Sequence, residues 1–157
     1  MTYATNKRKP PSGVGRWFAR APRYFYRIGL GRILGRRFVL IEHVGRRSGL
    51  ARQTVLEVIQ REPEALYVAA AWGTRSDWFK NISANSTVRI SSGNLQNVKS
   101  EATVLDRQSA VTIFERYAIE HATAARGLAK AFKLPFNDPE AMATAVPIVR
   151  LSIDNGP

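Results

Sequence analysis

The sequence contains no cysteine and only two histidines, and these shortages exclude several kinds of site. Without thiolates the chain can form no disulfide, no cysteine zinc site and no iron–sulfur cluster. A histidine-rich metal site is hard to build from His43 and His121 alone, so we expect no catalytic metal. No apolar run approaches the roughly 18 residues that span a bilayer, and no apolar signal core follows the basic N-terminus. We therefore expect a cytoplasmic protein.

Acidic residues are also scarce in the first third of the chain. Residues 1–52 contain 13 Lys or Arg and a single acid, Glu42, whereas residues 53–157 contain 11 of each sign. The net charge of +12 therefore arises in the N-terminal third. Such asymmetry indicates an anionic partner at that end, which can be a phosphate, an acidic cofactor tail, anionic lipid or nucleic acid.

The length of 157 residues fits one domain, which we place at residues 15–157. We expect residues 1–14, which are polar and basic, to form a flexible arm. Residues 15–35 have the pattern of two short amphipathic helices, because Pro22 and two glycines interrupt the pattern. One face carries apolar side chains at helical spacing, namely Phe18, Ala21, Phe25 and Ile28. Such a segment either covers a barrel or lies on an anionic membrane surface, which would make the protein peripheral at the inner face of the membrane.

Much of the remaining chain consists of short β-branched or alternating runs separated by turn residues. These runs predict strands at residues 37–44, 51–60, 65–71, 87–91, 98–105 and 148–153. Helical patterns cover residues 77–84, residues 107–133 and a short stretch through Ala143. Six or so mostly antiparallel strands with inserted helices predict a mainly β fold with helices, a split β-barrel. The parallel rhythm of a Rossmann fold and a Walker phosphate loop are both absent.

The strongest local motif is GRRSG at residues 45–49, a turn between two predicted strands. Its glycines let backbone N–H groups approach an anion closely. Arg46 and Arg47 supply planar guanidinium groups that match phosphate oxygens, and the Ser48 hydroxyl can complete the site, with Arg52 nearby. The motif predicts a phosphate-binding turn; the alternative is a solvated basic hairpin.

A second motif joins a run of small residues to the start of a helix. Three alanines at the end of a predicted strand leave room for a flat ring, and these are Ala69, Ala70 and Ala71. Ser76 is the expected N-cap of the next helix, whose N-terminus also favours anions. Trp78 and Asn81 on that helix either face the site or belong to the core, to which we assign Phe79 and Ile82.

Together these motifs resemble the deazaflavin-dependent nitroreductase and quinone reductase family. The resemblance rests on GRRSG followed by Arg52, on YVAA from Tyr67, on SDWFKNI from Ser76 and, more weakly, on VPIV from Val146. It implies an FMN-binding type of split β-barrel with coenzyme F-420, an 8-hydroxy-5-deazaflavin, as cofactor.

The resemblance also implies roles for particular residues. The turn would hold the cofactor phosphate through Arg46, Arg47 and Ser48, with Arg52 nearby. The backbone of the three alanines at residues 69–71 would face the deazaflavin ring. Trp78 and Asn81 match the helix that closes over the cofactor.

The proton donor is where this chain departs from the family. Family members carry several tyrosines beside the substrate in the segment that corresponds to residues 107–140. Here that segment has only Tyr117, with His121 a helical turn later. Tyr117 and His121 are our candidate catalytic residues. The alternatives are core packing for Tyr117 and a surface or packing role for His121.

The expected activity is hydride transfer from the reduced cofactor to a small-molecule electron acceptor such as a quinone, a nitro compound or an activated alkene. One alternative is an FMN-dependent oxidoreductase on the same barrel, with FMN as the second cofactor candidate. Another is a nucleic-acid-binding module, in which the basic arm and its interleaved aromatics contact phosphates and bases. Charge alone does not exclude this alternative, although we rank nucleic acid below a small-molecule electron acceptor as a partner.

Overall fold

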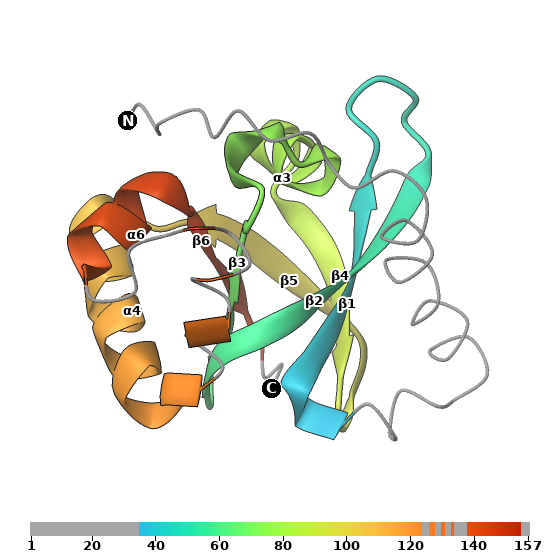
Figure 1. Ribbon diagram of the computed structural model, residues 1–157. Helices are drawn as coiled ribbons and strands as arrows, with labels where there is room; N and C mark the ends of the chain where they lie inside the picture. The colour runs from blue at the N-terminus through green and yellow to red at the C-terminus, as the bar shows by residue number, and fades with distance from the viewer. Residues whose placement is uncertain (1–34, 124–125, 128–129, 131–132, 134–137, 155–157) are drawn as a thin grey trace.

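The computed structural model describes residues 35–123, 126–127, 130, 133 and 138–154. Six antiparallel strands form a closed barrel in the order β1-β2-β3-β6-β5-β4 (Figure 1). The strands are β1 (Phe38–Val44), β2 (Ala51–Glu62), β3 (Ala65–Ala69), β4 (Thr87–Ser92), β5 (Leu95–Val104) and β6 (Ile148–Ser152). The helical elements are η1 (Gly35–Arg37), η2 (Gly73–Arg75), α3 (Asp77–Ala84), α4 (Arg107–Glu120) and α6 (Pro139–Ala145). The predicted barrel of mostly antiparallel strands is thus confirmed.

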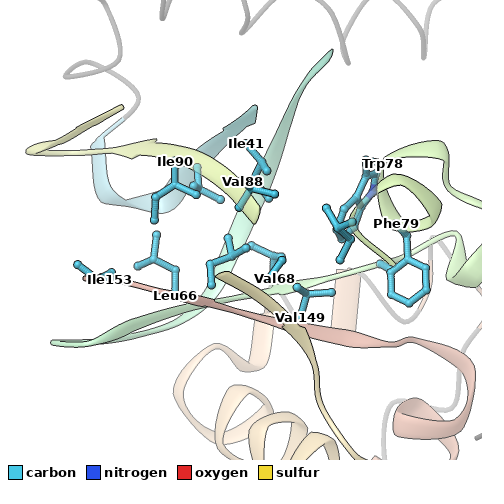
Figure 2. Packing of buried hydrophobic residues seen from close by; sticks show 14 residues of the cluster. Ile41, Leu66, Val68, Trp78, Phe79, Val88, Ile90, Val149 and Ile153 are labelled. Carbon is cyan, nitrogen blue, oxygen red and sulfur yellow. The ribbon is translucent and has the colours of Figure 1, made fainter. Parts of the chain in front are cut away.

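The barrel interior is filled by alternate residues of its strands, because successive side chains of a strand point to opposite faces. Helix α3 adds the rings of Trp78 and Phe79 to this core at one end of the barrel (Figure 2). The other core residues labelled there are Ile41, Leu66, Val68, Val88, Ile90, Val149 and Ile153. Because α3 is part of this core, its position relative to the strands is fixed by packing.

A second apolar cluster lies outside the barrel, where α4 and α6 cover β3 and β6 (Figure 1). Its members include Ile59, Tyr67, Ile113, Phe114, Tyr117, Met142 and Ile148. Each of the two helices begins at an aspartate whose carboxylate accepts a backbone N–H three residues later, Asp106 for α4 and Asp138 for α6. Such caps satisfy N–H groups that the helix itself cannot.

Strand β2 changes partner along its length. Residues 51–57 pair with β1, whereas residues 58–62 pair with β3. Strand β3 ends at Ala69, one residue past the pair formed by Val58 and Val68. Within the described chain, the edge of residues 51–57 that faces away from β1 therefore has no strand partner.

Strand boundaries differ from the sequence-based prediction by one to three residues, and two of these differences have a clear local cause. Strand β3 ends at Ala69 instead of residue 71, because the chain turns where Gly73 N donates to Ala70 O at 2.7 Å. Strand β5 begins at Leu95 instead of residue 98, because a two-residue turn with φ +59° at Gly93 pairs Ser92 directly with Leu95.

The predicted helix over residues 107–133 is interrupted at residue 121, and residues 122–123, 126–127 and 130 are helical again. Helix α4 ends at Glu120, and His121 leaves the helical conformation with φ −132°. The predictions for the arm at residues 1–14 and the amphipathic segment at residues 15–35 fall outside the described residues, except for Gly35. Among the helices that the structure describes, none combines the length and apolar character needed to cross a membrane.

Candidate functional site

The predicted arginine turn, residues 45–50, closes on itself between β1 and β2. Gly45 N donates to Leu50 O and Gly49 N donates to Gly45 O, each at 2.8 Å. Gly49 has φ +66°, a conformation that favours glycine. A Cβ at Gly45 would lie 2.6 Å from Ser48 Oγ. The backbone of the turn therefore favours glycine at residue 49, and Gly45 leaves Ser48 Oγ the space that a Cβ would take.

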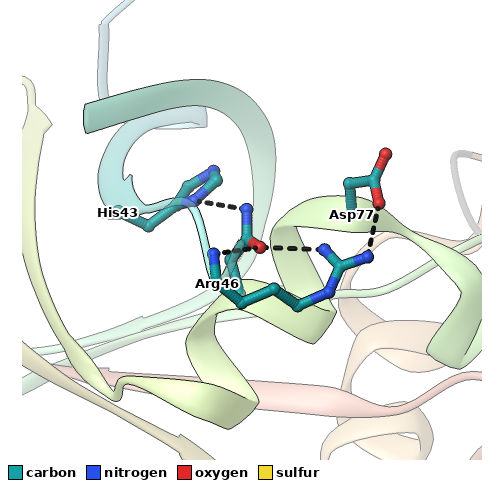
Figure 3. A network of polar contacts seen from close by, with 4 residues as sticks. His43, Arg46 and Asp77 are labelled. Carbon is teal, nitrogen blue, oxygen red and sulfur yellow. Dashed lines mark hydrogen bonds and ion pairs between the residues drawn. The ribbon is translucent and has the colours of Figure 1, made fainter. Parts of the chain in front are cut away.

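Arg46 attaches this turn to helix α3 (Figure 3). Its backbone N–H donates to Asn81 Oδ1 at 3.1 Å, and its Nη1 donates to the same oxygen at 2.9 Å. Its Nη2 pairs with Asp77 Oδ1 at 3.2 Å. The Arg46 side chain is 25% exposed and that of Asp77 is 84% exposed, so the bonds to Asn81 are better shielded from water than the ion pair. Two of the guanidinium nitrogens of Arg46 are thus engaged with α3.

His43 lies next to this attachment and is only 4% exposed. Asn81 Nδ2 donates to His43 Nδ1 at 3.2 Å, and His43 Nε2 lies 3.5 Å from Thr54 Oγ1. Burial lowers the pKa of His43 below its ordinary value, and the nearby charge of Arg52 lowers it further. The imidazole is therefore neutral at neutral pH, as its accepting Nδ1 requires.

These residues line a pocket of about 400 Å³, which we call the arginine pocket. Its lining is His43, Gly45, Arg46, Arg47, Ser48, Arg52, Gln53, Thr54, Asp77, Trp78 and Asn81. Within the part of the chain that the structure describes, the guanidinium groups of Arg47 and Arg52 have no hydrogen bond or ion pair, and the N–H groups of Arg47 and Ser48 have no acceptor. Three arginines face one carboxylate, so the pocket is suited to an anion.

Tyr117 and His121 lie elsewhere, in a pocket of about 550 Å³ between β2 and α4. We call it the β2–α4 pocket; it is lined by Arg36, Arg37, Glu57, Val58, Ile59, Gln60, Arg61, Arg116, Tyr117, Glu120 and His121. The Tyr117 and His121 rings are 5.4 Å apart, centre to centre. Burial raises the pKa of Tyr117 and the charge of Glu57 adds to the effect, so the phenol keeps its proton at neutral pH. Tyr117 is both a member of the outer apolar cluster and part of a pocket wall.

Strand β2 connects the two pockets. Gln53 lines the arginine pocket and Glu57 lines the β2–α4 pocket. Alternation places both side chains on the same face of the strand, and four residues of strand span roughly 13 Å. The structure therefore separates Tyr117 and His121 from the arginine turn, but it places both pockets along one strand.

The three alanines and Ser76 occupy varied positions. Ala70 is fully buried in the barrel core, whereas Ala69 and Ala71 are partly exposed, and none of the three lines either pocket. Ser76 stands at the N-cap of α3, but its side chain caps no helix N–H and instead donates to Gly73 O at 3.2 Å. The predicted N-cap position of Ser76 is therefore confirmed, but its hydroxyl makes no capping hydrogen bond.

Trp78 is both a core residue and part of the arginine-pocket lining, so the two alternatives considered for it both hold. Its ring contacts that of Phe79 edge to face, with centroids 5.9 Å apart. Phe79 and Ile82 are core residues, as expected.

The sequence interpretation missed His43 and Asp77 as parts of the site. A signal was present for His43, because alternation along β1 places it on the inward side with Val39 and Ile41, where a polar residue needs a partner. No comparable signal identifies Asp77, since an acid in the first turn of a helix is common. The described residues contain no group of three or more His, Cys, Asp or Glu that could hold a metal ion.

Comparison with known proteins places this geometry in context. Residues 18–124 match the profile of a family described as F420H(2)-dependent quinone reductase. No curated protein shows significant similarity to the chain.

Three solved structures share the fold. An F420-H2 dependent reductase is 19% identical over 74% of this chain and 95% of its own, with a TM-score of 0.53. A pyridoxamine 5'-phosphate oxidase-related, FMN binding protein from Nostoc punctiforme is 13% identical over 85% and 80%, with a TM-score of 0.53. The General Stress Protein 26 from Bacillus anthracis is 18% identical over 80% and 85%, with a TM-score of 0.52.

Proposed function

The chain belongs to the F420H(2)-dependent quinone reductase family, and from that membership we propose where its cofactor and its electron acceptor bind. It is an oxidoreductase that uses coenzyme F-420 and reduces a small-molecule acceptor. We assign the cofactor phosphate to the arginine pocket, the deazaflavin ring to the unpaired edge of β2, and the acceptor to the β2–α4 pocket.

The arginine pocket fits a phosphate group on three observations. The turn presents the N–H groups of Arg47 and Ser48 without acceptors among the described residues, and the side chains of Arg47 and Arg52 add two guanidinium groups that are similarly unengaged. Gly45 keeps open the space that a Cβ would take from Ser48 Oγ. The unengaged donors of Arg47, Ser48 and Arg52 are the single observation that carries the assignment. Arg46, by contrast, would act by holding the turn in place.

The unpaired edge of β2 is the place we propose for the ring. Residues 51–57 have no strand partner on that side in the described chain, and β3 ends there at Ala69, which is followed by two further alanines, Ala70 and Ala71. Side chains this small leave a flat ring room beside the backbone. When bound, the reduced deazaflavin supplies the hydride.

The β2–α4 pocket is the place we propose for the acceptor. Tyr117 contributes a protonated phenol and His121 an imidazole beside it, so either can supply the proton that follows hydride. Arg116 and Arg37 line the same pocket and can stabilise negative charge that develops on an acceptor oxygen. Quinones and nitro compounds, whose oxygens become negative on reduction, are therefore acceptor classes that suit this pocket.

FMN is the second cofactor candidate, because the arginine pocket recognises a phosphate and both cofactors carry one. The fold relative from Nostoc punctiforme described as FMN binding is compatible with that alternative. A discriminating test mixes the anaerobic protein with menadione and either reduced F-420 or reduced FMN, and follows cofactor absorbance. We expect oxidation of reduced F-420 to be accelerated at least about a hundredfold over the protein-free rate, which is the scale of positioned acid–base catalysis. Acceleration with FMN alone would overturn the assignment.

Attachment to an anionic membrane is a separate proposal, carried by the arginines and apolar residues of the segment 15–35. Each basic residue near an anionic surface contributes about 1 kcal/mol, and salt weakens that attraction. The full-length protein should then sediment with phosphatidylserine vesicles at low salt and be released at high salt. If the protein does not bind these vesicles at low salt, the membrane proposal is wrong, and the prediction of a cytoplasmic protein stands without peripheral attachment.

A further inference from the structure

His43 stands at an inward position of β1, paired across the ladder with Arg52, directly before the arginine turn. Its side chain is almost fully buried, although it is polar and titratable. Buried polar groups need hydrogen-bond partners, and the two partners of this imidazole are Asn81 and Thr54. The proposed cofactor site gives His43 no chemical role, so its position calls for another explanation.

The hydrogen bonds around Asn81 fix the direction of its amide. Asn81 Oδ1 accepts from the backbone N–H and from Nη1 of Arg46, so this end of the amide must be the oxygen. The Nδ2 end then faces His43 Nδ1, which must accept and therefore carries no proton. The imidazole proton lies on Nε2, on the side of Thr54 Oγ1.

A reversed Asn81 amide would place an NH2 group against two N–H donors of Arg46. His43 opposes that reversal, because its bare Nδ1 accepts from Nδ2 but would repel Oδ1. Asn81 is only 5% exposed, so water cannot readily replace the lost acceptor. The imidazole, in the tautomer with a bare Nδ1, thus supports the same orientation of Asn81 that the two donors of Arg46 require.

The charges around His43 agree with a neutral ring. Arg52 faces it across the ladder and disfavours protonation, whereas Glu42, its neighbour on β1, favours it. Arg46 lies on the far side of Asn81, where it pairs with Asp77. Burial and Arg52 outweigh Glu42, so the pKa of His43 is lowered.

We propose that His43 is a positioning residue of the arginine pocket: by accepting from Asn81, it orients the amide that holds Arg46 and so keeps the turn in its anion-binding shape. The proposal rests on the assignment of the cofactor phosphate to this pocket. His43 lines the same pocket, and in this proposal it acts through Asn81.

Two variants of nearly equal shape isolate the accepting atom. In His43→Asn, the side-chain oxygen stands at the same position along the side chain as Nδ1 and can accept from Asn81. In His43→Leu, a methyl group takes that place. We expect His43→Leu to weaken binding of coenzyme F-420 by about tenfold, the scale of one buried hydrogen bond. The F-420 affinity of His43→Asn should be within about threefold of that of the wild type. Fluorescence titration of the cofactor measures the affinities, and sulfate, which keeps its charge from pH 5 to 8, serves as an anion probe without a ring.

Nuclear magnetic resonance supplies a readout that needs no cofactor. In the wild-type protein the ¹⁵N shifts of His43 should show a protonated Nε2 and a bare Nδ1. The amide resonance of Arg46 should move in His43→Leu and return in His43→Asn. A proton on Nδ1, equal F-420 affinity in His43→Leu and wild type, or equal loss in both variants would overturn the proposal. Failure of the wild-type protein to bind F-420 or sulfate would instead overturn the proposed function, and the NMR comparison would still decide the role of His43.

Discussion

Arg46 and Asn81 are joined twice through one oxygen, since the backbone N–H and the guanidinium of Arg46 both donate to Asn81 Oδ1. The arginine turn is thereby attached to α3 by a contact that is buried on the Asn81 side. Helix α3 is in turn fixed by Trp78 and Phe79 in the barrel core. The turn is therefore held in place before any ligand binds, which lowers the ordering cost of binding.

The first prediction concerns the two arginines without protein partners in the described chain. Arg47→Ala and Arg52→Ala should each weaken binding of coenzyme F-420 by at least roughly tenfold, because charge-assisted bonds to phosphate contribute about 1.5–3 kcal/mol. Arg107→Ala removes the same charge from a surface ion pair with Glu140 and should leave affinity unchanged. Equal affinities for all three variants and wild type would mean that the turn is only a basic hairpin.

The second prediction compares the two partners of Arg46. Asn81→Ala removes three hydrogen-bond contacts, one buried and two part-buried, and should lower the free energy of unfolding by about 2–3 kcal/mol. Asp77→Asn removes only an exposed ion pair and should change the free energy of unfolding by less than about 1 kcal/mol. Urea unfolding followed by circular dichroism measures both, and a larger loss for Asp77→Asn would reverse the assignment of these contacts.

The third prediction concerns pH. Below about pH 6.5, the ordinary pKa of histidine, His43 takes up a proton in the unfolded chain but not in the folded protein, whose pKa is lowered. The unfolded state then binds more protons, so the free energy of unfolding should fall as pH drops below that value and level off at the folded-state pKa. His43→Asn has no such group, so its stability should depend less on pH between 7 and 5. Identical pH profiles for the two proteins would argue against a buried neutral imidazole.

The fourth prediction concerns the proton donor. If Tyr117 supplies the proton, Tyr117→Phe should lower turnover by about a hundredfold while F-420 affinity stays the same. His121→Gln is the matched test of the neighbouring ring. Lost folding with Tyr117→Phe would support a purely structural tyrosine, and an unchanged rate would direct attention to His121 or water.

Much of the fold could be predicted from the sequence because its signals are local. Alternation along β1 and β2, and the GRRSG turn between them, depend on neighbouring residues only. The errors fell where local signals are weak. Residues 95–97 continue β5 although Asn97 has a positive φ, a strand irregularity that no alternation reveals. The break between Glu120 and residue 122 lies within a sequence that favours helix on both sides.

The site was predicted less completely, because residue type does not reveal which partner a side chain takes. Arg46 and Arg47 are adjacent and identical, yet only Arg46 bonds to α3, since the partner Asn81 is 35 residues away. The rings of Tyr117 and His121, the two candidate catalytic residues, lie 5.4 Å apart. The separation of Tyr117 and His121 from the arginine pocket follows from the path of β2, and no single sequence motif predicts that path.

The most direct test of the account is a titration of purified protein with coenzyme F-420 and with FMN, carried out on wild type and on the double variant Arg47→Ala/Arg52→Ala. The account predicts that wild type binds F-420 more tightly than FMN. It also predicts that the double variant loses about a hundredfold or more in F-420 affinity while remaining folded, since two charge-assisted contacts are removed. Tighter binding of FMN, or a folded double variant that binds F-420 like wild type, would contradict it.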